Sequence, residues 1–137
     1  NQVHILGYVS DAKLRWLYRH CWAFVYPSLY EGFGLPVLEA MGFGAAVVTS
    51  NTTSLPEVGG DAVLYLNPTS EESISDALAK IDEPSRRSAY QAKSLQQARS
   101  FSWASSAAAV YAAYEQALQM PSHRRPLLGG EGIYSCQ

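Results

Sequence analysis

Residues 27–41, PSLYEGFGLPVLEAM, decide the fold class of this chain. They follow an apolar run, Ala23–Tyr26, that is typical of a buried strand, and they contain a glycine-rich turn at Gly32-Phe33-Gly34. Pro36 stands where the first turn of a helix tolerates proline. Small and apolar residues then recur on one helical face: Val37, Ala40, Met41 and Gly44. The stretch therefore predicts a strand, a tight turn and a helix in direct succession.

The same alternation continues on both sides of this stretch. Four short apolar runs predict strands: Val3–Leu6, Ala23–Tyr26, Ala46–Thr49 and Ala62–Tyr65. Helical patterns follow each run, with Ser10 as the N-cap of the first, Thr69 and Glu72 as a capping box, and two more helices over 84–99 and beyond Ser102. Apolar strands that alternate with helices indicate a parallel sheet covered on both faces, so we expect an α/β, Rossmann-like domain.

Length and composition bound the classes of protein that the chain can belong to. Its 137 residues suit one domain, which we place at 1–120, and the breaker-rich residues 121–137 predict a disordered tail. A net charge of -2 gives no electrostatic footprint for nucleic acid. No apolar run reaches the roughly 18–20 residues of a membrane-spanning helix. Cys21 and Cys136 show no metal-ligand spacing, and we expect a reducing, cytoplasmic location.

The turn at 32–34 has the layout of an anion site, because free amides and the positive end of a helix dipole point at it. Glu31 precedes the turn and Glu39 lies just past the first turn of the helix, so the two carboxylates can converge on one pocket. Carboxylates accept hydrogen bonds from hydroxyl groups, which favours a polyol beside the anion. The alternative stays open: glycine serves many tight turns, and Glu39 can simply complement the helix dipole.

Residues 27–41 closely resemble the signature of the group-1 (family 4) glycosyltransferases of GT-B fold, through Pro27-Ser28 and the run from Glu31 to Met41. Other segments resemble the family in the same order: Gly7-Tyr8-Val9-Ser10, Val47-Val48-Thr49-Ser50, Ser54-Leu55-Pro56-Glu57-Val58, Gly60-Asp61-Ala62 and Phe101-Ser102-Trp103. The resemblance spans about residues 3–118. It implies the donor-binding C-terminal domain of an enzyme that transfers a hexose from a nucleotide sugar.

The resemblance also implies a role for each matching residue. Glu31 would contact the hexose hydroxyls and stabilise charge during catalysis, and Glu39 would bind the ribose diol. The backbone of Gly32, Phe33, Gly34 and Leu35 would face the sugar and the diphosphate. Val9 would lie against the base. The family is expected to retain anomeric configuration and to need neither a metal nor a cofactor, with the nucleotide sugar as substrate.

Two departures from the family pattern shape the remaining expectations. The strand and loop that carry a basic pair, and the N-terminal acceptor-binding domain, have no counterpart in this stretch, so we expect a C-terminal fragment or a degenerate remnant that is inactive alone. A peripheral membrane association of the full-length parent is compatible with this. Apolar surface left uncovered predicts self-association. The alternative function is a non-catalytic module that binds a nucleotide or sugar nucleotide.

Overall fold

The computed structural model describes residues 3–119, and these fall into two compact units, 3–100 and 101–119. The first unit holds a three-stranded parallel sheet made of β1 (Phe24–Tyr26), β2 (Val47–Ser50) and β3 (Leu64–Leu66), in the order β1-β2-β3. Val25 lies opposite Val48, which in turn lies opposite Leu64. All four residues of β2 are buried, because β2 is the central strand.

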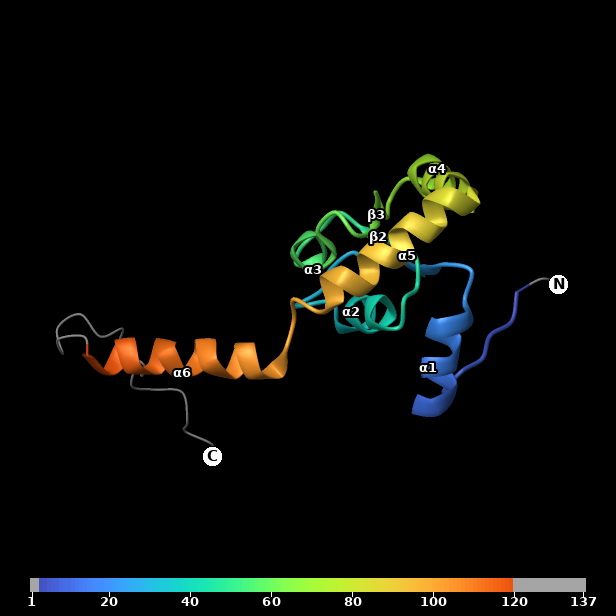
Figure 1. Cartoon of the computed structure of the whole chain (residues 1–137). Helices are drawn as coiled ribbons and strands as arrows, with labels where there is room; N and C mark the ends of the chain where they lie inside the picture. Colours follow the sequence, from blue (N-terminus) through green and yellow to red (C-terminus); the bar gives the residue numbers. More distant parts are fainter. Residues whose placement is uncertain (1–2, 120–137) are drawn as a thin grey trace, which may run out of the picture. The chain divides into compact units, whose positions relative to one another are not determined.

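Five helices surround this sheet (Figure 1). They are α1 (Asp11–His20), α2 (Leu35–Gly42), α3 (Leu55–Gly59), α4 (Glu71–Asp82) and α5 (Pro84–Ala98). α5 packs against both α4 and α2. The second unit, taken by itself, contains α6 (Trp103–Gln119).

Adjacent residues of β2 point into two separate cores. Val47 belongs to a cluster with residues of α2 and α3, including Met41 and Leu55. Val48 belongs to a second cluster with Ile81 of α4. The parallel sheet is thus covered on both faces, which confirms the α/β, Rossmann-like fold expected from the sequence.

The strand expected at Val3–Leu6 is not formed. This segment has no regular secondary structure and pairs with none of the three strands, and the side chain of Ile5 is 94% exposed. A strand is stable only when a neighbour completes its hydrogen-bonded ladder, and the described residues supply no such neighbour. The prediction was wrong because the apolar pattern reports a tendency toward burial and carries no information about a partner strand.

The capping box expected at Thr69 and Glu72 is also wrong. The N-cap of α4 is Ser70, whose hydroxyl accepts a hydrogen bond from the amide of Ser73 at 3.2 Å. Thr69 donates its amide and its hydroxyl to the Asn67 side chain, at 3.0 and 2.8 Å. Asn67 therefore forms a turn with its own downstream backbone, and the helix begins after that turn.

The remaining elements agree with the sequence pattern to within two residues. The strand expected at Ala62–Tyr65 begins at Leu64 instead, and Ala62 and Val63 are buried in the turn before it. The expected domain boundary at residue 120 stays a prediction, and the tail expected at 121–137 lies outside the described residues.

Exposed apolar side chains are numerous in both units. In the first unit they include Val3, Ile5 and Tyr8, and α6 carries a stripe of its own: Trp103, Val110, Tyr111, Tyr114 and Leu118. Self-association through this surface stays a prediction. No helix within residues 3–119 combines the length and apolarity needed to cross a bilayer.

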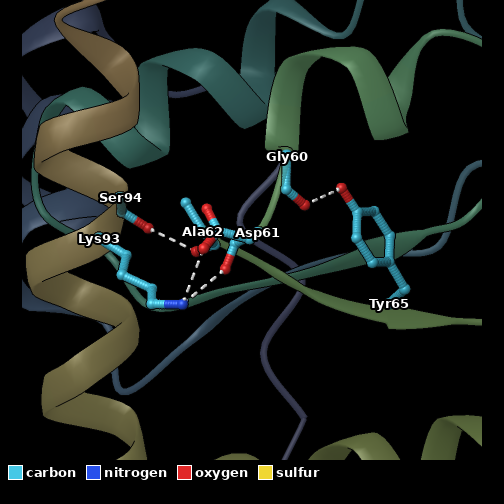
Figure 2. Close-up of polar contacts among 6 residues, drawn as sticks. All are labelled: Gly60, Asp61, Ala62, Tyr65, Lys93 and Ser94. Carbon is cyan, nitrogen blue, oxygen red and sulfur yellow. Dashed lines mark hydrogen bonds and ion pairs between the residues drawn. The ribbon is translucent and has the colours of Figure 1, made fainter.

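α5 holds the turn that connects α3 to β3 (Figure 2). The Lys93 ammonium donates to the Asp61 carboxylate at 3.0 Å and lowers the pKa of that carboxyl. The buried Ser94 hydroxyl donates to the Ala62 carbonyl at 3.3 Å. These bonds cross 32 positions of sequence and tie the position of α3 to α5.

Two further side chains hold the same turn and the end of α3. Tyr65 of β3 donates its hydroxyl to the Gly60 carbonyl at 2.7 Å (Figure 2), and the Gln97 amide donates to the Val58 carbonyl at 3.2 Å. α3 is therefore held from β3 as well as from α5.

Replacing Ile81 by alanine tests the second core. Ile81 is fully buried against β2, so Ile81→Ala should lower the free energy of unfolding by about 2–5 kcal/mol, through lost burial and the cavity left behind. Lys93→Ala is the control, since its ion pair with Asp61 is exposed and such pairs contribute little to stability. Urea unfolding followed by circular dichroism measures both. Equal losses in the two variants would contradict this account of the core.

Candidate functional site

Glu31 lies in the loop after β1, and two hydroxyl groups hold its side chain. The Tyr26 hydroxyl donates to Glu31 Oε1 at 2.5 Å, and the Ser28 hydroxyl donates to the same oxygen at 2.9 Å. Within residues 3–119, Oε2 receives no hydrogen bond. One oxygen therefore fixes the carboxylate and the other is left to accept hydrogen bonds from a ligand.

These hydrogen bonds set the protonation state of Glu31. The hydroxyls of Tyr26 and Ser28 stabilise the ionised form and lower the pKa of Glu31 below its ordinary value of 4.5. The same bond to Glu31 raises the pKa of Tyr26, so the tyrosine keeps its proton and remains a donor. Glu31 is ionised at neutral pH.

The backbone of Glu31 is held from the loop after β2. Its amide donates to the Thr53 hydroxyl at 3.1 Å, and its carbonyl accepts from the Ser54 hydroxyl at 3.1 Å. Thr52 donates to the Leu29 carbonyl at 3.4 Å. These three residues were missed as part of the site by sequence reasoning. The signal was present, however, as three consecutive hydroxyl side chains one residue after a buried strand.

The two glycines of the turn have different surroundings. Gly34 is buried with φ +98°, and a Cβ there would lie 2.7 Å from the Leu55 side chain, so this position requires glycine. A Cβ on Gly32 would meet nothing within 4 Å. Phe33 and Leu35 are exposed beside them. Gly34 thus serves the close contact with α3, whereas Gly32 leaves its surroundings open to a ligand.

The start of α2 offers fewer open amides than a helix usually does. Gly34 is the N-cap, Pro36 has no amide proton, and the amides of Val37 and Leu38 both donate to the Gly34 carbonyl, at 3.0 and 3.2 Å. Within residues 3–119, the amides of Gly34 and Leu35 donate no hydrogen bond. The positive end of the helix dipole adds to their attraction for an anion.

Glu39 is exposed on α2 and is held by a different tyrosine. The Tyr18 hydroxyl of α1 donates to Glu39 Oε2 at 3.3 Å. Burial, followed by the charge of Glu39, raises the pKa of Tyr18 to about 12, so the phenol keeps its proton. The two side chains border a hollow of about 370 Å³, whose other lining residues are Asp11, Leu14, Arg15 and Phe43.

The two carboxylates accept hydrogen bonds from different side chains, Glu31 from Tyr26 and Ser28 and Glu39 from Tyr18. Glu31 is absent from the lining of the hollow beside Glu39, so a single pocket shared by both stays a prediction. Val9 is half-buried just before the N-cap of α1, and its contact with a base stays a prediction too. Among the described residues, no three His, Cys, Asp or Glu side chains are grouped to hold a metal ion.

Sequence reasoning also missed the two tyrosines. Tyr26 ends the strand expected at Ala23–Tyr26, where its ring is partly buried, and Tyr18 of α1 is buried in the core that contains Val47. A buried tyrosine needs a hydrogen-bond partner for its hydroxyl, and each of these finds a carboxylate. That requirement was the available signal, although the sequence does not reveal which acceptor satisfies it.

Comparison with known proteins identifies the family of this chain. The model of the family "Glycosyl transferases group 1" matches residues 1–98, which include both glutamates and the turn between them. The O-antigen chain mannosyltransferase B of Escherichia coli is 51% identical over 102 residues, covering 74% of this chain and 27% of that protein. The serotype-specific mannosyltransferase WbdA of the same organism is 42% identical over 121 residues, covering 87% of this chain and 15% of that protein.

A solved structure shows the same fold. The sucrose-phosphate synthase of Thermosynechococcus elongatus superimposes with a TM-score of 0.72 at 24% identity, covering 82% of this chain and 29% of that one. The chain spans about a quarter or less of the length of these two mannosyltransferases. Since the family match extends over residues 1–98, this chain belongs to the group 1 glycosyl transferases.

Proposed function

We propose that this chain binds a nucleotide-sugar donor, as the donor-binding part of a retaining glycosyltransferase that transfers a hexose. The observation that carries the proposal is Glu31: an ionised carboxylate, held rigidly through one oxygen, stands three residues before the open amides at the start of α2. This combination pairs an acceptor for sugar hydroxyls with a site for a diphosphate.

The names of the relatives support one hexose. Both Escherichia coli proteins are mannosyltransferases by name, and one of them shares 51% of its residues with this chain over the aligned region. We therefore propose mannose as the sugar of the donor. The base of the nucleotide is left to the titration below.

Each part of the donor has a group in the site that suits it. In the proposed complex, Glu31 Oε2 accepts hydrogen bonds from the hexose hydroxyls, and the amides of Gly34 and Leu35 donate to the diphosphate. Glu39 accepts from the ribose diol through Oε1, because Oε2 is already bonded to Tyr18. Val9 contacts the base. The exposed backbone of Gly32 and Phe33 borders the sugar.

The proposed reaction moves the sugar without changing its anomeric configuration. The bond between the anomeric carbon and the diphosphate oxygen breaks, and an acceptor oxygen forms its new bond on the same face. The acceptor proton passes to the departing diphosphate, whose charge the start of α2 stabilises. Glu31 orients the hexose and stabilises positive charge on the ring without forming a covalent bond. This scheme uses no metal ion.

The rival proposal is a module that binds a sugar nucleotide without transferring the sugar. It needs the same site residues, so binding alone does not separate the two. Because the chain spans 27% of its mannosyltransferase B relative, we assign the acceptor site to residues outside this chain. Sugar transfer by a protein that contains this chain, abolished by a change at Glu31, would favour the transferase.

Replacing Glu39 by glutamine tests the ribose contact. Hydrogen bonds to a charged group contribute about 1.5–3 kcal/mol, so Glu39→Gln should weaken binding roughly tenfold to a hundredfold. The measurement is an NMR titration of the chain with UDP, GDP, ADP and their mannose esters, observing the amides of Gly32 and Gly34. Removal of both ribose hydroxyls from the nucleotide that binds should cost affinity in the wild type and little more in the variant.

Glu72→Gln is the matched control, since Glu72 is an exposed carboxylate in the first turn of α4. It should leave binding unchanged. Additive losses from the Glu39 change and the missing ribose hydroxyls would show that Glu39 does not contact the ribose. Absence of binding at millimolar ligand by a folded chain would contradict the donor site itself.

The hydroxyl of Tyr26 should govern the pH dependence of the site. Because it lowers the pKa of Glu31, Tyr26→Phe should raise that pKa toward 4.5. The hydrogen bonds to ionised Glu31 stabilise the fold above its ordinary pKa, and this contribution is lost as the pH falls through the lower, folded-state pKa. Carbon-detected NMR titration of the Glu31 carboxyl measures the shift, and Tyr30→Phe in the same loop is the control. An unchanged pKa in Tyr26→Phe would contradict the assignment.

A further inference from the structure

Three consecutive hydroxyl residues after β2, Thr52-Thr53-Ser54, hold the backbone of the loop that carries Glu31. Thr53 accepts from the Glu31 amide and Ser54 donates to the Glu31 carbonyl, both at 3.1 Å. Both backbone polar groups of a single residue are thus bound by adjacent side chains 22 and 23 positions away. We call Thr53 and Ser54 the Glu31 clamp.

Thr53 adopts an uncommon backbone conformation to make its bond. Its φ of 53° lies in the left-handed region, and it is the sole non-glycine residue with positive φ within the described chain. This conformation is unfavourable for a β-branched residue, and such conformations concentrate at functional sites. Glycine would adopt it without cost, but glycine has no hydroxyl for the Glu31 amide.

The clamp is not needed merely to satisfy polar groups. The bond between Glu31 and Thr53 is exposed, so water can replace the hydroxyl as an acceptor. What water cannot supply is a fixed position. The next residue, Leu55, packs directly beneath Gly34, so the segment 53–55 holds both the carboxylate and the glycine of the same turn.

We propose that Thr53 and Ser54 are positioning residues that hold Glu31 where the donor hexose binds. The inference rests on the proposed function and adds that different residues hold the side chain and the backbone of Glu31. Tyr26 and Ser28 fix the carboxylate through its side chain, and the clamp fixes the backbone from the loop after β2. The hexose contact therefore depends on the clamp, whereas the nucleotide contacts of Glu39 and of the α2 amides do not include it.

The test compares two ligands on the chain: the nucleoside diphosphate that binds in the titration above, and its mannose ester. Thr53→Ala and Ser54→Ala should each weaken binding of the mannose ester about two- to tenfold, the loss expected for one hydrogen bond. Both should leave the affinity for the nucleoside diphosphate unchanged. Thr53→Ser keeps the hydroxyl and should restore binding of the ester.

Thr69→Ala is the matched control, because it removes an exposed threonine hydroxyl that bonds only within its own turn. Equal losses for both ligands in the clamp variants would show a purely structural role and overturn the inference. Unchanged affinity for the ester would overturn it as well.

A measurement without ligand separates this inference from the proposed function. Hydrogen exchange of the Glu31 amide should be about two- to tenfold faster in Thr53→Ala than in the wild type and in Thr53→Ser. If the wild type binds neither ligand, the proposed function fails, and the role of the clamp at a donor site fails with it. If the wild type binds both and amide exchange does not respond to Thr53→Ala, the clamp alone is wrong.

Discussion

The parallel pairing of β1 with β2 is the constraint on which the site depends. Tyr26 lies opposite Thr49, and the Thr49 hydroxyl donates to the Tyr26 carbonyl at 2.9 Å, which fixes the ends of the two strands side by side. Because the strands run in the same direction, the loops that follow them leave at the same edge. The loop with Glu31 and the loop with Thr53 meet there for that reason. β2 in turn keeps its place through burial on both faces, with Val47 in one core and Val48 in the other.

Local patterns predicted the elements that are buried by other parts of the described chain. They failed where an element's formation or its first residue depends on a residue or strand outside the local pattern. The succession of strand, turn and helix at 23–42 was readable because turn glycine, helix-start proline and apolar spacing agree. The segment at Val3–Leu6 has an equally apolar pattern, yet no neighbouring strand completes its ladder. α4 begins one residue later than expected because Thr69 donates its amide and hydroxyl to the Asn67 side chain. Propensity alone does not predict which of two neighbouring hydroxyl residues caps the helix.

The candidate site was likewise predictable only in the part that depends on local sequence. The glutamates and glycines were identifiable from their spacing around one turn, since the turn is local. The residues that hold them, Tyr18, Tyr26 and Thr53, were not identifiable as such. Two of these contacts span 21 and 22 positions, and all three depend on how α1, β1 and the loop after β2 pack. A tyrosine on an apolar face reads as core from sequence, and its hydroxyl acquires a specific acceptor only once the elements are assembled.

Electrostatics limits how this site can hold a donor of the proposed kind. A diphosphate beside Glu31 and Glu39 is repelled by both carboxylates. In the proposed complex, the amides of Gly34 and Leu35 and the dipole of α2 attract it. The attraction from two amides is weak compared with that repulsion. Affinity in the proposed complex must therefore come largely from hydroxyl groups of the ribose and hexose, which ionised carboxylates bind strongly. Such bonds are directional, so their strength depends on how well each carboxylate is held. In the proposed complex this suits the observed geometry, in which each glutamate accepts a tyrosine hydroxyl through one oxygen and, within residues 3–119, no hydrogen bond through the other.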